Sequence, residues 1–285
     1  MSDGVDHSRG SRPEARDDFA EETAGPAARR LGTVYLQGVR LNAMTKAQCV
    51  AHMLDELDAG RGGWLITQNL SYLRRSSRDP AFAALCSKAT LSVADGMPLL
   101  WACALQGTPL PDRIAGSDLV LILPGAAAQR GRSVYLLGGS PGTAHETARI
   151  LKMRQPGARV AGVCCPPIGF ERDPQEIARI QEELTGTKPD IVFVALGTPK
   201  QDYLIDELRP VLPSAWWLGV GVSFSFVAGR LRRAPLWVQR AGLEWVHRLV
   251  QEPRRLGRRY LLEGLPFACW LLAASVVEGW SRRRR

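Results

Sequence analysis

The amino-acid sequence predicts an α/β fold in which a mostly parallel sheet carries helices on both faces. Short apolar runs typical of buried strands alternate along the chain with longer segments whose apolar residues recur at helical spacing. Residues 133–166 show this best, because two strand-like runs and the helix-like segment between them have the length of a βαβ unit. At 285 residues, the chain can bury a substantial core as one large or two small domains.

The individual elements follow from the same patterns. Residues 1–30 are rich in charged residues, Gly, Ala and Pro, so we expect them to be disordered and the core to begin at residue 31. In the first part of the core we expect a hairpin at 33–41, a helix at 45–59, and strands at 63–68 and 90–94 with a helix through Tyr72 and Leu73 between them. Further on we expect strands at 133–139, 158–166, 190–197 and 215–221, and helices at 141–153, 173–185 and 199–209.

Residues 230–285 carry the whole of the net positive charge. They contain thirteen arginines, four glutamates and no lysine or aspartate, which matches the formal charge of +9 for the full chain. We therefore divide the folded part into a nearly neutral core at 31–229 and a basic helical appendage at 230–285. Nucleic acid, an anionic membrane surface or a phosphate-bearing substrate would each suit such an appendage.

Cysteine and histidine usage predicts neither a disulfide framework nor a metal site. The six cysteines include no CxxC pair, which favours a reducing compartment, and the four histidines lack the spacing of zinc ligands. We therefore expect no bound metal. The N-terminus has no apolar core of the signal-peptide kind, so we expect a cytoplasmic protein.

Polar loops follow four of the expected strands. In parallel sheets, ligands bind beyond the carboxyl ends of the strands, so four such loops on one edge favour a binding site. Any single loop could instead serve only as a turn or helix cap. The candidate site residues are Thr67 and Asn69, Asp95, Gly138 and Gly139, and Gly197, Lys200 and Gln201.

The glycine-rich loop "LLGGSPG" at 136–142 lies between an expected strand and helix. Its backbone N–H groups could hold a phosphate or pyrophosphate at the helix N-terminus. It is neither a GxGxxG dinucleotide motif nor a Walker A loop, so it supports nucleotide binding without identifying the nucleotide.

Six segments in order resemble the WecG/TagA/CpsF family of bacterial glycosyltransferases, over roughly residues 33–260. They are "TQN" at 67–69, "ADGMP" at 94–98, "DRIAGSDL" at 112–119, "ALGTPKQDYL" at 195–204, "GVGVSFSFVAG" at 219–229 and "RRAPLWVQRAGLEWVHRLVQEPRR" at 232–255. The sequence departs from the family pattern at Asp202, where Glu is usual, and at Ser71, where Glu is frequent. Neither departure touches Asp95.

The resemblance implies a Rossmann-like core of the GT-E type and a C-terminal appendage that closes over the site. It also implies an inverting transfer of a sugar, N-acetylmannosamine or another hexose, from a UDP-sugar to a polyprenyl-diphosphate-linked saccharide. Family members work at the cytoplasmic membrane face in the synthesis of teichoic acid linkage units, capsule or exopolysaccharide. The reaction is regarded as metal-independent and needs no cofactor, and the sequence has no DxD motif.

The resemblance also implies roles for single residues. Asp95 would be the general base, a role for which a rigid strand end is a suitable mount. Thr67 and Asn69 would orient hydroxyl groups, and Arg113 would contact phosphate or sugar unless it only pairs with Asp112 or Asp118. The loop from Gly197 to Lys200, with Gln201, would face the donor, although Lys200 could equally be a solvated side chain.

The C-terminal arginines are expected to serve two ends. Arg233, Arg248 and Arg254 would pair with the diphosphate of donor or acceptor, and the later ones would hold an anionic leaflet. The uncharged run 264–277 is shorter than the roughly 20 apolar residues of a membrane span, which predicts a peripheral protein on the inner face of the membrane. A helix packed on the core or on a second subunit is the alternative.

Two other classes of protein are alternatives to a glycosyltransferase. A nucleic-acid-binding protein would suit the arginine-rich end, but no recognition module is evident, so we expect no nucleic-acid partner. A Rossmann oxidoreductase would need the missing GxGxxG motif. Self-association is open, since Trp216 and Trp217 could form an exposed apolar face or belong to the core.

Overall fold

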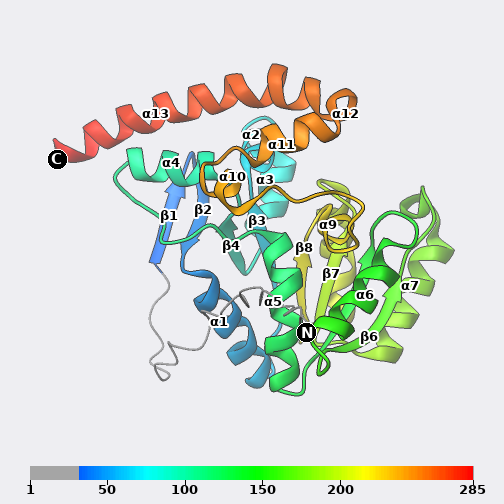
Figure 1. The fold of residues 1–285 in the computed structure, drawn as a ribbon. Helices are drawn as coiled ribbons and strands as arrows, with labels where there is room; N and C mark the ends of the chain where they lie inside the picture. The colour runs from blue at the N-terminus through cyan, green and yellow to red at the C-terminus, as the bar shows by residue number, and fades with distance from the viewer. Residues whose placement is uncertain (1–31, 285) are drawn as a thin grey trace, which may run out of the picture. The chain divides into compact units, whose positions relative to one another are not determined.

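The computed structural model describes residues 32–284, so the expected disordered segment 1–30 lies outside the described residues. Six strands form a parallel sheet in the order β4-β3-β8-β7-β5-β6, and β1 and β2 form a separate antiparallel hairpin (Figure 1). The strands are β1 Gly32–Leu36, β2 Val39–Ala43, β3 Gly63–Gln68, β4 Leu91–Ala94, β5 Ser133–Gly138, β6 Arg159–Cys164, β7 Ile191–Ala195 and β8 Trp216–Gly219. The predicted parallel α/β fold is confirmed.

Helices connect the strands and extend beyond the last one. The helices of the core are α1 Lys46–Asp58, α2 Leu70–Ser76, α3 Pro80–Ser87, α4 Met97–Leu105, α5 Gly116–Gln129, α6 Thr143–Arg154, α7 Pro174–Thr187, α8 Lys200–Leu208 and α9 Ser223–Val227, with short turns η1 Phe170–Arg172 and η2 Arg209–Val211. After them come α10 Leu236–Arg240, α11 Glu244–Gln251, α12 Pro253–Gly257, the π-helix η3 Arg258–Gly264 and α13 Leu265–Arg283. Residues 70–87 form two helices instead of the single one expected, and α5 was not expected at all.

The two faces of the sheet are covered by different sets of helices. Helices α1, α5, α6 and α9 cover one face, where Leu65, Val93 and Leu218 are buried. Helices α2, α3, α7 and α8 cover the other, where Trp64 and Trp217 are buried. Because Trp216 and Trp217 are 0% and 1% exposed, the suggestion that they form an exposed apolar face is wrong, and they belong to the core.

The order of the strands decides which loops meet at the carboxyl edge. Strand β8, the last in the sequence, pairs with β3 on one side and β7 on the other. The loops after β4, β3, β8 and β7 therefore lie side by side along the sheet, although they come from residues 69 to 221. The loop after β5, which holds the glycine-rich segment, follows next.

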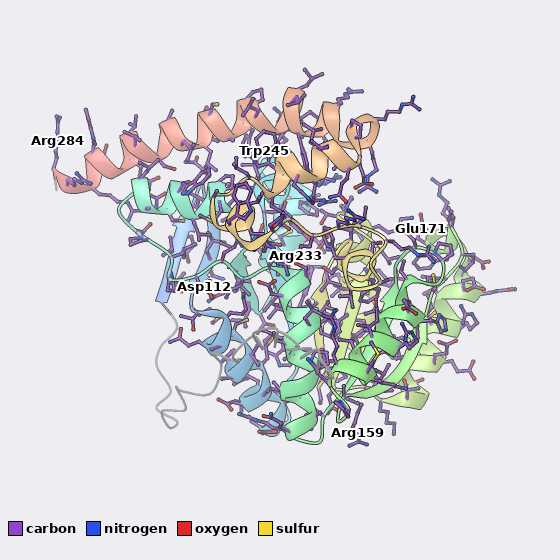
Figure 2. All side chains as sticks on the ribbon, in the orientation of Figure 1. Asp112, Arg159, Glu171, Arg233, Trp245 and Arg284 are labelled. Atoms are coloured by element: carbon purple, nitrogen blue, oxygen red, sulfur yellow. The ribbon has the colours of Figure 1, made fainter. Side chains whose placement is uncertain are left out.

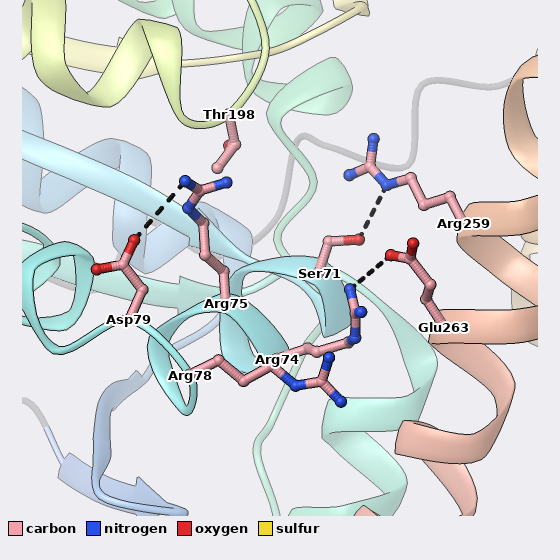
Figure 3. A pocket seen from close by; sticks show the side chains of 8 residues that line it. All are labelled: Ser71, Arg74, Arg75, Arg78, Asp79, Thr198, Arg259 and Glu263. Atoms are coloured by element: carbon pink, nitrogen blue, oxygen red, sulfur yellow. Dashed lines mark hydrogen bonds and ion pairs between the residues drawn. The ribbon is translucent and has the colours of Figure 1, made fainter.

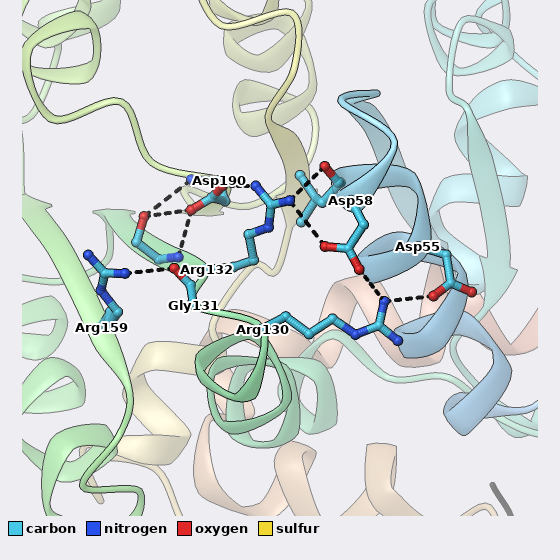
Figure 4. Close-up of polar contacts among 9 residues, drawn as sticks. Asp55, Asp58, Arg130, Gly131, Arg132, Arg159 and Asp190 are labelled. Atoms are coloured by element: carbon cyan, nitrogen blue, oxygen red, sulfur yellow. Dashed lines mark hydrogen bonds and ion pairs between the residues drawn. The ribbon is translucent and has the colours of Figure 1, made fainter.

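The amino-terminal edge of the sheet is held by an ion-pair network (Figure 4). Arg130 Nη1 donates to Asp55 and Asp58 at 2.6 and 2.7 Å, while Arg132 contacts Asp58 and Asp190, each at 3.1 Å. Partly exposed pairs contribute little singly, but the network ties the end of α1 to the starts of β5 and β7. This edge is structural, which leaves the carboxyl edge for a site.

The C-terminal helices form a continuous helical segment, Pro253–Arg283, of 31 residues. One side of it packs on α4 and the hairpin, where Phe267 and Leu271 are buried with Leu36 and Leu99 (Figure 1). By length and composition alone this helix could cross a membrane, and 11% of its most apolar stretch is buried. The uncharged run 264–277, which is too short to span a membrane by itself, is thus part of a longer helix.

Candidate functional site

Asp95 stands directly after β4 at the carboxyl edge. Its backbone N–H donates to Gln68 O at 2.6 Å, which fixes the end of β4 beside β3. The next residue, Gly96, has φ of 140°, a conformation that residues with side chains rarely adopt. Gly96 is also the N-cap of α4, and no side chain caps that helix. Asp95 therefore does not cap α4, although its carboxylate accepts the backbone N–H group of Gly116 at the start of α5.

The surroundings of Asp95 make it a suitable proton acceptor. Burial raises the pKa of Asp95 to about 6, although the nearby Arg113 guanidinium acts against this rise. The carboxylates of Glu244 and Asp118 add to it, because negative charge nearby disfavours ionisation. At neutral pH the group is ionised and yet more basic than an ordinary aspartate, which is what general-base chemistry requires.

Arg113 lies beside Asp95 and is held by the C-terminal segment. Its Nη1 donates to Glu244 Oε2 at 2.8 Å and its Nη2 donates to Gln239 Oε1 at 3.1 Å. An ion pair for Arg113 was expected only with neighbouring aspartates. Asp118 instead pairs with Lys46, Nζ to Oδ2 at 2.6 Å, and with Arg233. Residues from both sides of the 229/230 boundary thus form one charged cluster around Asp95.

The charges in this cluster compensate one another. Burial acts to raise the pKa of Asp118, but the hydrogen bond from Lys46 and the charge of Arg233 together hold it below its usual value. Arg233 Nε also lies 3.9 Å from Glu244 Oε1. The cluster therefore keeps the Asp118 carboxylate ionised close to Asp95, whose pKa is raised.

The three C-terminal arginines expected at the site lie in different surroundings. Figure 2 shows Arg233 between the C-terminal segment and the sheet, where it joins the cluster described above. The Arg248 guanidinium stacks 5.5 Å from the centre of the Phe226 ring in α9 and pairs with Glu252 at 3.6 Å. Arg254 is exposed on α12. The structure thus places Arg233 at the Asp95 cluster, while Arg248 lies over the helix that follows β8.

Thr67 lies near the end of β3 and Asn69 directly follows this strand, which pairs with β4, the strand that precedes Asp95. Thr67 is buried, and α5 begins so close to it that a Cβ at Gly116 would lie 3.5 Å from Thr67 Oγ1. Asn69 Oδ1 accepts the backbone N–H groups of Ser71 and Tyr72 at 3.0 and 3.2 Å, so it caps α2. Only the amide nitrogen of Asn69 is left for contact with a ligand.

Gln201 is a buried clamp between two loops of the carboxyl edge. Its Oε1 accepts the N–H groups of Gly197 at 3.1 Å and Gly221 at 3.0 Å, and its Nε2 donates to Tyr72 Oη at 2.9 Å. The side chain is 2% exposed. Gln201 therefore holds the loops after β7 and β8 together from a buried position. The sequence motif alone did not reveal this role.

Tyr72 and Asp202 complete this buried network. Tyr72 Oη donates to Asp202 Oδ1 at 2.7 Å, and burial raises the pKa of Asp202 to about 7 despite that hydrogen bond. Sequence reasoning noted Asp202 only as a departure from the family pattern and gave Tyr72 no role. Glu244 and Gln239 were missed too, although both lie within the quoted C-terminal block.

Replacing Gln201 by Leu should destabilise the fold by about 2–4 kcal/mol. The substitution removes the acceptor of two half-buried backbone N–H groups, of Gly197 and Gly221, and the donor to Tyr72 Oη, which still donates to Asp202. Each group left unsatisfied costs about 1–3 kcal/mol. Urea unfolding followed by circular dichroism measures the change. Gln175→Leu, at an exposed position of α7, is the matched control and should change stability by less than about 0.5 kcal/mol.

The remaining loop residues lie further along the edge. Lys200 Nζ pairs with Glu171 Oε1 at 2.6 Å, so it is engaged, with a side chain 39% exposed. Gly138 and Gly139 end β5 at positive φ, and a Cβ on Gly139 would lie 2.5 Å from Thr143 Oγ1. Gly139 lines a cavity of about 300 Å³ together with His145 of α6 and residues of the loops after β5 and β6.

The described residues offer no set of metal ligands. Within 32–284, no three His, Cys, Asp or Glu side chains are grouped so that they could hold an ion. The six cysteines, all within this range, are free.

Comparison with known proteins agrees with the six segments found in the sequence. Residues 34–281 match the family described as "Glycosyl transferase WecG/TagA/CpsF family". An N-acetylglucosaminyldiphosphoundecaprenol N-acetyl-beta-D-mannosaminyltransferase from Bacillus spizizenii is 34% identical over 202 residues, 71% of this chain and 76% of the relative. A protein of the same name from Bacillus subtilis strain 168 is 29% identical over 202 residues, 71% of this chain and 77% of the relative. The chain belongs to the WecG/TagA/CpsF family of glycosyltransferases.

Proposed function

We propose that this protein transfers a hexose from a UDP-sugar to a saccharide carried on a polyprenyl diphosphate, with Asp95 as the general base. The observation that carries the proposal is the position of the Asp95 carboxylate at the carboxyl end of β4, within a cluster that includes Arg113, Asp118 and Glu244; burial raises its pKa although Arg113 opposes the rise. The names of the two relatives, both N-acetylmannosaminyltransferases with a diphosphoundecaprenol acceptor, support this acceptor class and favour N-acetylmannosamine as the sugar.

The proposed reaction is a single displacement that inverts the anomeric carbon. The acceptor hydroxyl oxygen attacks that carbon while the bond between the carbon and the UDP oxygen breaks, and UDP leaves with the bonding electrons. The hydroxyl proton passes to the Asp95 carboxylate. Asp95 then returns the proton to solvent, so that the enzyme is unchanged and atoms and charge balance.

The arginines are proposed to stabilise the negative charge that develops on the leaving diphosphate. Planar guanidinium groups suit paired phosphate oxygens, and Arg113 and Arg233 already lie in the cluster around Asp95. Arg248 and Arg254 are proposed to extend this positive surface along α11 and α12 toward the acceptor. Thr67 and Asn69 would orient sugar hydroxyls, and the loops that Gln201 shapes, with Gly138, Gly139, Gly197 and Lys200, would receive the donor.

We also propose that the protein attaches to the inner face of the cytoplasmic membrane without crossing it. The helix Pro253–Arg283 packs on α4 with one side, while Leu262, Val277 and Trp280 on it are 73%, 66% and 64% exposed. Exposed apolar side chains flanked by arginines are typical of interfacial helices. A lipid-linked acceptor would reach the site from that surface.

A donor panel tests the proposed activity. The purified protein is incubated with different UDP-sugars and a synthetic lipid diphosphate that carries N-acetylglucosamine, and UDP release and product mass are measured. We expect transfer from at least one UDP-hexose, with UDP-N-acetylmannosamine the first choice. Absence of transfer from every UDP-hexose, or transfer only from a donor with another nucleotide, would contradict the proposal.

Chelation is expected to leave the transfer rate unchanged. Arginine side chains are proposed to take the place of a divalent cation at the diphosphate, so the rate with excess EDTA should stay within about twofold of the rate without it. Recovery of a lost rate by added magnesium or manganese would show that a metal, rather than the arginines, stabilises the leaving group.

A further inference from the structure

An arginine-lined cavity of about 370 Å³ lies between α2, Thr198 in the loop after β7, and the C-terminal helix (Figure 3). Four arginines contribute to its lining: three from α2 and the turn after it, and one from η3. They are Arg74, Arg75, Arg78 and Arg259. Two carboxylates, Asp79 and Glu263, share the lining, so the charged groups around the cavity sum to +2.

Two of the four guanidinium groups are already compensated, and two are not. Arg74 Nη1 lies 2.7 Å from Glu263 Oε2, and Arg75 Nη2 lies 3.7 Å from Asp79 Oδ2. Arg78 and Arg259 have no carboxylate within 4.0 Å among the described residues, and Arg259 Nε donates only to the Ser71 hydroxyl at 3.2 Å. Like charges gathered around one cavity repel, so the arrangement favours a bound anion.

The cavity lies beside α2, whereas Asp95 lies at the start of α5, but the lining also includes Thr198, in the loop after β7 between Gly197 and Lys200. Asp95 faces the start of α5, where a backbone hydrogen bond from Gly116 acts on it. Helix α2 belongs to the other face, where its Tyr72 is buried with α3 and α8. The cavity thus faces a different helix from Asp95, and the test below compares a phospholipid with a prenyl diphosphate to identify the anion.

The cavity also lies where the polar part of the C-terminal helix meets its apolar part. Arg259 and Glu263 come from the same helical segment as Leu261 and Leu262, which are 46% and 73% exposed. If those leucines enter the acyl region of a membrane, the cavity is at the depth of the phosphates. Basic pockets at this depth bind lipid head groups.

We propose that this cavity binds the phosphate head group of an anionic membrane phospholipid, with Arg78 and Arg259 as its main contacts. A phosphodiester would replace the missing carboxylate partners and would fix α2 and η3 at a defined depth on the membrane. The assignment rests on the membrane attachment included in the proposed function, but its test below requires no sugar transfer, so the two can fail separately.

The test measures binding of a soluble short-chain lipid to the full-length protein. Dihexanoyl phosphatidylglycerol, kept below its micellar concentration, is titrated by calorimetry, with dihexanoyl phosphatidylcholine as the zwitterionic comparison. We expect saturable binding of one phosphatidylglycerol per chain, roughly tenfold or more tighter than phosphatidylcholine, since charge-assisted hydrogen bonds to phosphate depend on net charge.

Two pairs of variants locate the binding. Ser71→Glu places a carboxylate within reach of Arg259, whereas Ser71→Gln is its neutral counterpart of similar size. Arg78→Glu removes a lining cation, and Arg154→Glu makes the same charge change at an exposed position at the end of α6. We expect Ser71→Glu and Arg78→Glu to weaken phosphatidylglycerol binding by roughly tenfold or more, and both controls to leave it within about twofold.

Three results would overturn the assignment. The first is equal binding of the two lipids by the wild-type protein, and the second is an equal loss of binding in the variants and their controls. The third is that farnesyl diphosphate competes with phosphatidylglycerol and that Ser71→Glu weakens the binding of both ligands to the same degree. The last result would assign the cavity to the diphosphate of a prenyl-linked acceptor instead. Because Ser71 and Arg78 keep some exposure and are replaced independently, a folding defect in one variant leaves the other informative.

Discussion

Asp95→Asn is expected to lower the rate of sugar transfer by about 10²–10⁴-fold while leaving UDP binding unchanged. The amide has the shape of the carboxylate but cannot accept the proton of the attacking hydroxyl, and general-base assistance is worth about this factor. Steady-state kinetics with the best donor of the panel measures the loss, and calorimetry with UDP measures binding. A variant that turns over at nearly the wild-type rate would remove Asp95 from the mechanism.

The same variant should be more stable than the wild type at neutral pH. The folded-state pKa of Asp95, about 6, lies above the ordinary value of 3.8, so the folded protein holds this proton more tightly than the unfolded chain. Stability therefore falls as pH rises from about 4 to above 6, by on the order of 1–3 kcal/mol for this partly exposed group. The amide side chain of the variant does not ionise, so thermal unfolding at pH 7.5 should occur at a higher temperature in the variant, and the difference should vanish below about pH 4.

Arg113→Ala is expected to have the second largest effect, a loss of about 10²-fold in kcat/KM. The substitution removes a guanidinium proposed to face the leaving diphosphate, and such preorganised donors are worth about this much. It also removes the positive charge that opposes the raised pKa of Asp95, so the pH at which activity is half maximal should move upward from about 6. The pH profile separates this role from a merely structural one.

Two further substitutions check the sign of that shift. Arg113→Lys keeps the positive charge but not the forked geometry, so the rate should fall while the pH midpoint stays near that of the wild type. Glu244→Gln removes a negative charge that raises the pKa of Asp95, so the midpoint should move downward. Midpoints that move the other way, or not at all, would show that these charges do not act on the catalytic carboxyl group.

Sequence reasoning could place Asp95 at the mouth of a strand because the necessary signals are local. An apolar run, a carboxylate, a glycine and a helix start lie within residues 90–98, and the βαβ pattern is likewise a matter of neighbouring residues. The loops after β3, β4 and β7 were correctly assigned to one edge, since parallel strands end on the same side.

The rest depends on contacts between residues far apart in the chain. No local pattern predicts that β8 enters between β3 and β7, and this insertion is what allows Gln201 to bridge Gly197 and Gly221. The partner of Arg113 is Glu244, 131 residues away, whereas sequence neighbours suggested Asp112 or Asp118. Helix α5, apolar on more than one side and interrupted by Pro124, gave too weak a helical pattern to be expected.

The pH dependence of kcat/KM for the wild-type enzyme and the Asp95→Asn variant shows whether Asp95 is the general base. We expect the wild-type value to rise about tenfold per pH unit below a midpoint near 6 and to be constant above it, because only ionised Asp95 can accept the proton. In Asp95→Asn the small residual activity should show no such transition. A wild-type profile that is flat between about pH 5 and 8, or a transition that persists in the variant, would contradict the assignment of Asp95 as the base.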